Sequence, residues 1–190
     1  RVEQQKQRLL QAVEKHKNDP AILLWAVGNE MEGAGKDPRV WQAVNDLARA
    51  IKKTDPHHLT ITVIAELGEG KIEAFQKYCP DVDILGVNSY GGFGSVATRL
   101  RERGYNGPFI VTEWGTLGPW EGGYSPWRAP LEMTSTQKAD FAMANYHRTV
   151  NRNPEHCLGA YAFLWGHKQE RTGTWFGILL PAGSRTQLAD

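Results

Sequence analysis

The sequence predicts an α/β fold built around a parallel sheet, either an open doubly wound sheet or part of a barrel. Helical and strand-like stretches alternate from end to end of the 190 residues, which is the pattern of βα units around such a sheet. The candidate functional residues follow the strands, where parallel α/β sheets bind their ligands. A complete (β/α)8 barrel typically needs ~250 residues, so the chain is about three βα units short of one.

Three helices and three strands are predicted in the first half of the chain. The first helix stops at Asn18-Asp19-Pro20, a strong helix-ending signal. Asp37 is a typical N-cap, and Pro38 suits the first position of the second helix. β-branched residues are dense in the second strand. In order, the predicted elements are a helix over 2–17, a strand over 21–27, a helix over 40–51, a strand over 59–64, a helix over 71–78 and a strand over 82–87.

The second half continues the alternation and contains a long loop. Residues 114–133 show no periodicity and are rich in Gly, Pro and Trp, and loops of this length inside compact domains are usually functional. Thr134 and Gln137 have capping-box spacing at the start of the helix that follows. In order, the predicted elements are a helix over 95–103, a strand over 108–112, a helix over 134–152, a strand over 158–165 and a tail over 166–190.

Composition and charge limit the classes of function. Hydrophobic residues make up 41% and charged residues 23% of the chain, which is ordinary for a soluble globular protein. Since 22 basic residues face 21 acidic ones, no single-sign field would gather nucleic acid or an anionic membrane, and a neutral substrate fits better. No apolar segment is long enough to span a membrane. A secreted or periplasmic location is favoured over a cytoplasmic one.

Seven tryptophans and two cysteines are the other informative residues. The Trp content is high for this length and indicates either a heavy core or flat stacking platforms, which suit sugars. Cys79 and Cys157 are far apart in the sequence and lie within or beside apolar stretches, so they indicate neither a disulfide framework nor a metal site.

Two glutamates, Glu30 and Glu113, each follow a short apolar run. Such runs are typical of strands buried on both faces, so both carboxylates are expected where a core strand ends. If the two ends are neighbours, the pair suits glycosidic bond cleavage, in which one carboxyl group donates a proton and the other attacks or steers water. The alternative is a pair of salt-bridged glutamates at a sheet edge. The flanking sequences, Asn-Glu and Thr-Glu-Trp-Gly, favour chemistry.

These motifs resemble the clan A retaining glycoside hydrolases, with the closest likeness to the TIM barrel domain of family 2 and family 5 type enzymes. In that clan the fourth strand ends in Asn-Glu, the acid/base, and the seventh in the nucleophilic Glu, often within Thr-Glu-aromatic-Gly. Asn29-Glu30 and the Thr-Glu-Trp-Gly motif at 112–115 match both. Tyr90 and Trp165 stand where the clan tends to place a Tyr or His after the sixth strand and a Trp at the end of the eighth.

The resemblance implies a (β/α)8 TIM barrel of which this chain covers about strands 4 to 8. We therefore expect residues 1–190 to form a single domain that is part of a catalytic barrel. The remainder of the barrel or another copy is expected to complete the fold. In the clan, an Arg after the second strand and often a residue after the third help to form the sugar site, and neither has a counterpart here.

The resemblance also implies a retaining mechanism with assigned roles. Glu113 is the expected nucleophile and Glu30 the expected acid/base, with their carboxylates ~5–5.5 Å apart. Tyr90 is expected to hold Glu113 through its hydroxyl group. Asn29 is expected to donate its amide to the sugar 2-hydroxyl. Trp165 is expected to form the floor of the subsite.

Other residues near the strand ends are weaker candidates. Trp114, Trp120, Trp127 and Trp175 are each better explained by packing or loop anchoring when taken singly, although at least one is expected to line the cleft. We name Trp114 as one candidate for substrate contact. His167, just past Trp165, is another.

Glu66 and Glu69 follow the second strand and have a smaller claim to substrate contact, because they are also ordinary polar loop residues. His57 and His58 precede that strand, at the end opposite to Glu30, and are interpreted as structural.

The expected function is hydrolysis or transfer of a β-linked glycoside of an oligo- or polysaccharide. No nucleotide cofactor is expected, because no phosphate-loop or dinucleotide glycine pattern is present. No metal is expected either, since the two glutamates lack a nearby His or Asp cluster. Two alternatives stay open: a non-catalytic carbohydrate-binding or scaffold fragment of a larger glycosidase, and a metal-dependent hydrolase with both glutamates as ligands.

Overall fold

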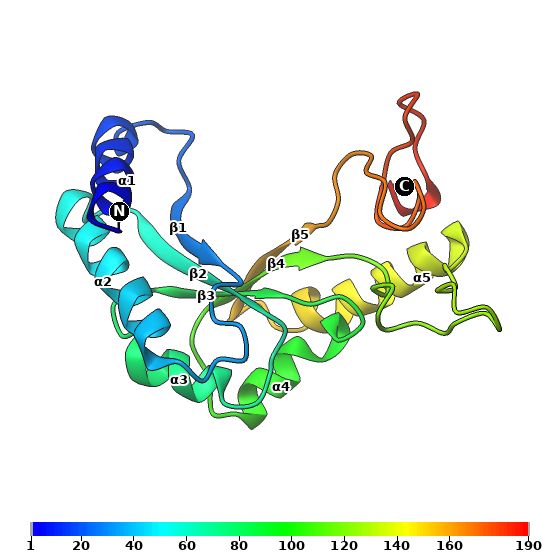
Figure 1. Ribbon diagram of the computed structural model, residues 1–190, viewed down its shortest axis with the longest axis horizontal. Coiled ribbons are helices and arrows are strands. Elements are labelled where there is room, and N and C mark those ends of the chain that lie inside the picture. The colour runs from blue at the N-terminus through cyan, green and yellow to red at the C-terminus, as the bar shows by residue number, and fades with distance from the viewer. Residues whose placement is uncertain (1, 190) are drawn as a thin grey trace. The chain divides into compact units, whose positions relative to one another are not determined.

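The protein structure, a computed structural model, describes residues 2–189. Five strands alternate with helices along the chain (Figure 1). The strands are β1 (Leu24–Asn29), β2 (Leu59–Ala65), β3 (Ile84–Asn88), β4 (Phe109–Trp114) and β5 (Cys157–Ala162). The α-helices are α1 (Val2–His16), α2 (Pro38–Thr54), α3 (Lys71–Tyr78), α4 (Val96–Glu102) and α5 (Ser135–Tyr146). Short helical turns cover Phe93–Ser95, His147–Asn151 and Gln187–Ala189.

The strands form one parallel sheet in the order β1-β2-β3-β4-β5, which confirms the predicted α/β class and agrees with part of a (β/α) barrel. The prediction that β1 is buried on both faces is wrong. Only Val27 of that strand is fully buried, whereas every residue of β3 is. The reason is position in the sheet, because β1 is an edge strand with β2 as its partner.

The chain clusters into two compact units. Unit 1 comprises Arg1–Val87 and Leu100–Ile110, and unit 2 comprises Asn88–Arg99 and Val111–Asp190. In unit 1, Leu24 packs against a core of Ile61, Ile84 and Ile110 from the strands. Helix α2 contacts both β1 and β2 and buries an apolar stripe that includes Trp41 (Figure 1). As predicted, α2 begins with Asp37 as N-cap and Pro38 in the first turn.

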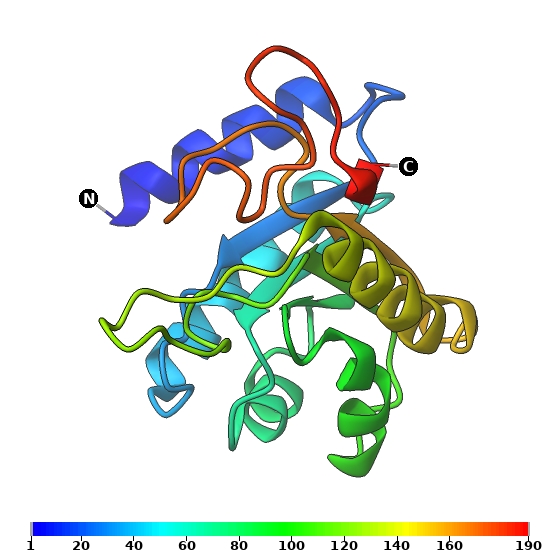
Figure 2. The ribbon, with the colours of Figure 1, turned by 90° about the vertical axis from the view of Figure 1, so that its right-hand side faces the viewer.

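Unit 2 is built around α5, β5 and the segment after β5. Figure 2 shows α5 beside the C-terminal segment, which it contacts through residues 187–189. The predicted capping box is present, because the Thr134 side chain accepts from the Gln137 amide and the Gln137 side chain accepts from the Thr134 amide. The predicted helix over 134–152 ends its α-helical part at Tyr146 and continues as one π-helical turn.

The predicted strand over 158–165 is too long at its carboxyl end, because β5 stops at Ala162. The next residues pair with the tail instead. The Leu164 amide donates to the carbonyl oxygen of Phe176 at 3.0 Å, and the Ile178 amide donates to that of Leu164 at 3.3 Å. Trp165 therefore lies in a loop after the strand.

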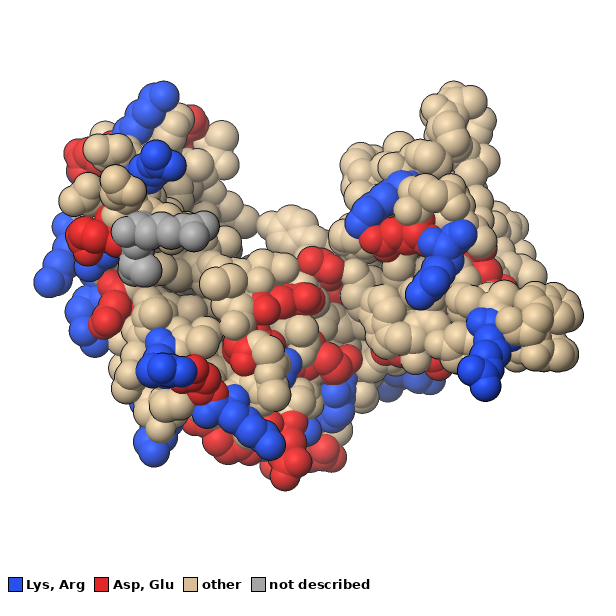
Figure 3. Space-filling model, viewed as in Figure 1, with Lys and Arg blue, Asp and Glu red and all other residues tan. Residues whose placement is uncertain are grey.

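Surface charge is mixed. Basic and acidic side chains alternate over α1 and α2 in Figure 3, so this part of the described surface carries no extended patch of one sign. Within residues 2–189, no helix has both the length and the apolar character needed to cross a membrane.

Candidate active site

Glu113 lies near the carboxyl end of β4, in unit 2. Neighbouring groups fix the backbone on which it stands. The Ser89 amide donates to the carbonyl oxygen of Glu113 at 2.8 Å, and the Thr112 hydroxyl donates to the side-chain oxygen of Asn88 at 2.7 Å. The last residue of β3 and the residue after it therefore hold the end of β4.

The Glu113 carboxylate accepts a hydrogen bond from the Tyr90 hydroxyl, with 2.7 Å between Oη and Oε2. Tyr90 is in turn packed among aromatic rings, with centroid distances of 5.1 Å to Phe176, 6.0 Å to Phe163 and 5.7 Å to Trp120. Ring packing of this kind limits the rotamers of Tyr90, and its hydroxyl therefore holds the carboxylate in one orientation. We call Glu113, Tyr90 and these three rings the Glu113 cluster. The structure brings together these two predicted residues.

Trp114 faces away from the Glu113 side chain, because consecutive residues of a strand point to opposite faces. Its ring stacks on Phe93 at 4.9 Å and lies 5.7 Å from the ring of Tyr146. It also lines a cavity of about 630 Å³ together with residues of α5 such as Met143. This placement favours a packing role for Trp114 over the predicted contact with substrate.

Gly115, the last residue of the Thr-Glu-Trp-Gly motif, has a packing role. A Cβ atom at this position would lie 2.7 Å from the carbonyl oxygen of Phe163. Only glycine allows the two backbones to approach this closely. The motif therefore joins the chain after β4 to the chain after β5, and the Phe163 amide also donates to the carbonyl oxygen of Trp114 at 2.7 Å.

Glu121 belongs to the same region and was not found from the sequence. Its Oε2 accepts from the amide of Gly118 at 2.7 Å and from the amide of Gly91 at 2.9 Å. It thereby links the loop over 114–133 to the segment that carries Tyr90. A single glutamate in an aperiodic loop gives no sequence pattern that would have identified this role.

Trp165 and His167, the other predicted residues of unit 2, lie in the loop after β5. Trp165 is 75% exposed and His167 is also exposed. An exposed indole is available for stacking against a ligand.

A part-buried ion pair holds the far end of the loop over 114–133. Lys138 Nζ lies 2.5 Å from Glu132 Oε1, and the Thr172 hydroxyl donates to the other oxygen of Glu132.

Burial raises the pKa of Glu132, but hydrogen bonds from Lys138, Thr172 and Thr174 outweigh burial and hold that pKa below its usual range. Glu132 is therefore an ionised anchor, and it ties the end of the loop to the tail.

Glu30 lies in unit 1, directly after β1. The β1–β2 register shifts between Ala26 and Asn29, so a bulge immediately precedes it. Bulges redirect a side chain at the end of a strand. Glu30 itself has a left-handed backbone conformation with φ of 52°, and its amide donates to the carbonyl oxygen of Val63 at 2.9 Å. Non-glycine residues in this conformation are strained and cluster at functional sites. Asn29 is exposed at the end of the bulge.

A buried ion pair anchors the chain beside Glu30. Lys71 Nζ lies 2.7 Å from Glu32 Oε1, and the two side chains are 7% and 3% exposed. The same Glu32 oxygen accepts from the amide of Ala65 at 3.0 Å, at the end of β2. Lys71 also donates to the carbonyl oxygen of Ala65. We call Glu30, Glu32, Lys71 and Ala65 the Glu30 segment. Glu32 and Lys71 could not be identified from the sequence, because they lie far apart in the chain.

Glu66 resembles Glu30 in its backbone. It directly follows β2 and has φ of 50°. Its Oε1 accepts from the amide of Leu67 at 2.7 Å.

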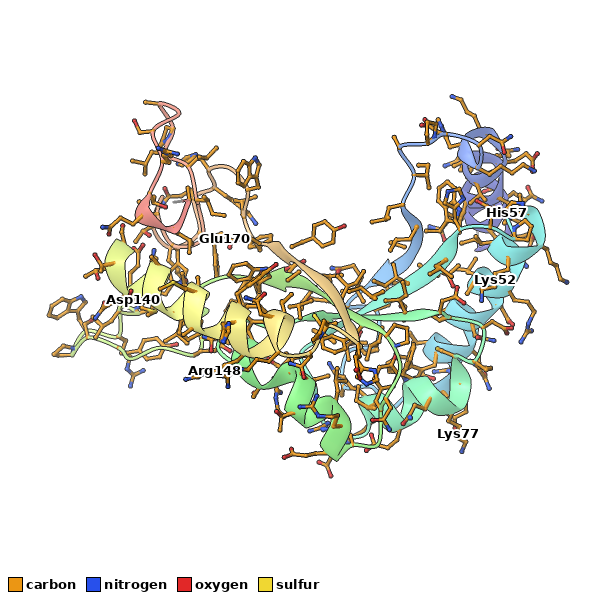
Figure 4. The ribbon with its side chains drawn as sticks, turned by 180° about the vertical axis from the view of Figure 1, so that it is seen from behind. Lys52, His57, Lys77, Asp140, Arg148 and Glu170 are labelled. Atoms are coloured by element: carbon orange, nitrogen blue, oxygen red, sulfur yellow. The ribbon has the colours of Figure 1, made fainter. Side chains whose placement is uncertain are left out.

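The histidines that precede β2 lie at the amino end of the strand, as Figure 4 shows for His57. His58 Nδ1 lies 2.7 Å from Asp55 Oδ2, which also accepts from the indole nitrogen of Trp25 at 2.8 Å. Burial raises the pKa of Asp55, but hydrogen bonds from Trp25 and from His57 and His58 hold that pKa well below its usual range. This cluster is structural.

Neither cysteine is suited to nucleophilic chemistry, because burial raises the pKa of Cys79 to about 12 and also raises that of Cys157. Over residues 2–189, no group of three or more His, Cys, Asp or Glu side chains is arranged to hold a metal ion.

Comparison with known families gives one match. Residues 2–159 match the family described as "Glycosyl hydrolases family 2, TIM barrel domain". No curated protein matches the sequence.

Several solved structures share the fold at low sequence identity. A β-D-glucuronidase from Dictyoglomus thermophilum is 19% identical, with a TM-score of 0.70 over 97% of this chain and 34% of the other. A GH39 β-xylosidase from Caulobacter crescentus is 20% identical, with a TM-score of 0.71 over 99% of this chain and 46% of the other. β-Glucuronidase 2 from Bacteroides uniformis is 16% identical, with a TM-score of 0.67 over 95% of this chain and 24% of the other. The chain thus spans between about a quarter and a half of these relatives.

Proposed function

Because this chain belongs to the TIM barrel domain family of the family 2 glycosyl hydrolases, we propose that it cleaves or transfers β-linked glycosides with retention of configuration. Glu113 is the nucleophile of this proposal and Glu30 its acid/base. The observation that carries it is the hydrogen bond from Tyr90 to Glu113, which orients a strand-end carboxylate within an aromatic cluster. An oriented carboxylate is what a nucleophile in a displacement at carbon requires.

The reaction proceeds in two displacements. In the first, a Glu113 oxygen attacks the anomeric carbon, the glycosidic C–O bond breaks, and Glu30 gives its proton to the departing oxygen. In the second, Glu30 takes a proton from water, the water oxygen attacks the anomeric carbon, and the bond to Glu113 breaks. If a sugar hydroxyl replaces water, the outcome is transfer. This chemistry requires the two carboxylates to lie ~5–5.5 Å apart in the working enzyme.

Three further residues complete the proposed site. Asn29 donates its side-chain amide to the 2-hydroxyl of the sugar, an interaction that strengthens in the transition state. Trp165 offers its exposed ring as a stacking floor, and His167 contacts a hydroxyl group nearby. Exposed aromatic and polar side chains after a strand suit recognition of a sugar, which has both apolar and hydroxyl surfaces.

The relatives support covalent chemistry on a glycoside. β-Glucuronidase 2 from Bacteroides uniformis has been solved covalently bound to cyclophellitol-6-carboxylate aziridine. A covalent adduct with a sugar-like electrophile is the behaviour expected of an enzyme with a nucleophilic carboxylate.

The free edges of the sheet support the expectation that further strands complete the barrel. Leu23 before β1 is 70% exposed, and Leu158 and Tyr161 of β5 are 54% and 56% exposed. Large apolar side chains along an edge strand favour pairing or covering of that edge. We propose that the rest of a barrel, or another copy, covers them.

Covalent labelling tests the proposal. The full-length protein would be incubated with dinitrophenyl 2-deoxy-2-fluoro-β-glycosides of glucose, galactose, xylose and glucuronic acid, and with cyclophellitol aziridines, then digested for peptide mass mapping. We expect the added mass on Glu113, and none on the Glu113→Gln variant. Label on another residue would overturn the assignment. Carbohydrate binding without label or turnover would instead favour the non-catalytic alternative.

A further inference from the structure

Trp120 is exposed although it belongs to the aromatic packing around the proposed nucleophile. Its side chain is 63% exposed. Its ring meets Tyr90 edge-on at 5.7 Å and lies 6.3 Å from Phe176. An indole that is packed along one edge and has most of its surface in water can stack against a ligand.

The backbone of Gly118 packs against the ring of Trp120. A Cβ atom at Gly118 would lie 2.4 Å from Cε2 of Trp120, so the glycine backbone lies directly against the indole. One side of the ring is therefore covered by Gly118 and one edge by Tyr90. The exposed part of the ring is held in place as a platform.

The loop that carries Trp120 is also fixed. The neighbouring Glu121 accepts from the amides of Gly91 and Gly118 at 2.9 and 2.7 Å. The bond from Gly118 closes the turn that holds Trp120, and the bond from Gly91 ties this turn to the segment that carries Tyr90. A platform that is already ordered before binding loses little conformational entropy when a ligand stacks on it.

We propose that Trp120 is the aromatic wall of a separate sugar subsite, which binds a pyranose ring adjacent to the sugar that Glu113 attacks. The continuous contacts from Glu113 through Tyr90 to Trp120 place this wall beside the proposed nucleophile and not at a remote surface. A pyranose is neutral and presents a face of C–H groups, which suits an indole face. The inference rests on the proposed function and adds to it that the substrate has at least two sugar units.

The same loop provides a matched control. Trp127 is 78% exposed and lies in a turn closed by its own hydrogen bond, from the amide of Arg128 to the carbonyl oxygen of Ser125 at 2.9 Å. Removing Trp127 deletes the same type of side chain from the same loop without touching the clamp at Glu121.

The experiment compares short and long substrates in the full-length protein. Wild type would first be screened with p-nitrophenyl β-glycosides of glucose, galactose, mannose, xylose and glucuronic acid. The preferred sugar would then be tested as the aryl monoglycoside and as β-linked di- to tetrasaccharides. For Trp120→Ala we expect kcat/KM to fall about 10- to 100-fold on oligosaccharides. On the monoglycoside it should fall less than about 3-fold, because Phe163 and Phe176 still pack against Tyr90 and keep its hydroxyl on Glu113.

Trp120→Phe is expected to recover most of the loss, and Trp127→Ala to behave as wild type on both substrates. Equal losses of kcat/KM on short and long substrates would overturn the subsite, because they would mean that Trp120 acts through Tyr90 and Glu113. No loss on either would also overturn it. Unfolding midpoints in urea would show whether each variant is folded.

If the wild type hydrolyses no glycoside, the proposed function is refuted. The binding of sugar by Trp120 would then be tested separately. Electrophoresis through gels containing soluble β-glucan, xylan or mannan would then be compared between wild type and Trp120→Ala. Retardation that Trp120→Ala abolishes and Trp127→Ala keeps would support the sugar platform. No retardation of wild type in any gel would refute it.

Discussion

The two proposed catalytic glutamates are held in different ways. Glu113 stands within a regular strand, and the side chain of Tyr90 bonds directly to its carboxylate. Glu30 stands just past a bulge in a left-handed conformation, on a chain that the buried Glu32–Lys71 pair anchors two residues further on. The Tyr90 hydroxyl holds the carboxylate of Glu113, and at Glu30 the amide hydrogen bond to Val63 and the nearby ion pair hold the backbone.

This difference matches the different demands of the two proposed roles. A nucleophile attacks in one geometry, so an oriented carboxylate favours it. An acid/base exchanges its proton twice in each cycle, first with the leaving oxygen and then with water. The left-handed backbone of Glu30 and the nearby Glu32–Lys71 ion pair fix the position of such a group. The comparison predicts that the two regions fail in different ways when altered.

The largest expected difference concerns the leaving group of the substrate. Glu113→Ala is expected to lower kcat on the order of 10⁴-fold or more on every aryl glycoside, since no nucleophile remains. Glu30→Ala is expected to lower it about 10²- to 10⁴-fold on unactivated glycosides. It should slow the first step far less on dinitrophenyl glycosides, which leave without a proton. Steady-state and burst kinetics would measure both steps.

Azide and a matched variant provide the controls for this pair. With azide, Glu30→Ala should form a glycosyl azide of retained configuration and Glu113→Ala one of inverted configuration. If Glu30→Ala gave the inverted azide and Glu113→Ala the retained one, Glu30 would be the nucleophile and Glu113 the acid/base. Glu66→Ala removes a glutamate with almost the same φ at the end of the next strand, and it should retain activity.

The next largest effect is expected at the buried ion pair between Glu32 and Lys71, close to Glu30 in the chain. Lys71→Met leaves Glu32 buried without its partner, which typically costs about 3–5 kcal/mol of folding free energy. The double variant Glu32→Gln with Lys71→Met should recover much of that stability, because no uncompensated charge remains. Urea unfolding of the single and double variants would measure this coupling. If the single variant is as stable as wild type, the pair does not brace the segment.

Measurements of kcat show whether the ion pair positions Glu30 or only stabilises the fold. In the folded double variant, we expect kcat to fall on unactivated glycosides and to change little on dinitrophenyl glycosides, as for a weaker form of Glu30→Ala. Equal losses on both substrates would show that the pair does not act through the acid/base.

Tyr90→Phe tests the hydrogen bond that holds the carboxylate of Glu113. It removes one hydrogen bond to a charged group, worth about 1.5–3 kcal/mol, so kcat/KM should fall roughly 10- to 150-fold. Aryl glycosides with good and poor leaving groups should be affected alike, because the step that forms the bond to Glu113 is slowed for both. The aromatic ring is kept, so the unfolding midpoint should stay near that of wild type. A loss confined to poor leaving groups would contradict the assignment.

The sequence predicted the helices, strands and helix caps well, but it predicted burial less well. The α/β alternation, the N-cap at Asp37 and the capping box at Thr134 were recognisable, because they depend on local patterns. The hydrogen bond between Tyr90 and Glu113 was also expected, through the family resemblance. The burial of β1 was not, since burial of an edge strand depends on which strands are its neighbours and not on its own apolar run.

The supporting residues could not have been predicted, because each depends on contacts between distant parts of the chain. Lys71 reaches Glu32 from 39 residues away, and Glu121 reaches Gly91 from 30 residues away. Neither pair has a spacing that a helix or strand would impose. Trp120 was interpreted as a packing residue for the same reason, and only its exposed fraction distinguishes a platform from a core side chain.

The smallest expected effect lies at the amino ends of the strands, away from Glu30. Asp55 has a pKa held below its usual range, so its stabilising effect is complete above the ordinary aspartate pKa of about 3.9 and is lost as the pH falls toward the depressed value. Asp55→Asn should therefore lower stability by about 1–3 kcal/mol at pH 7 and flatten the loss below about pH 4. Urea unfolding between pH 3 and 7 measures both. Because this cluster is remote from the Glu30 segment, kcat of the folded variant should stay at the wild-type value, and a loss of kcat would show that Glu30 depends on the stability of unit 1 as a whole.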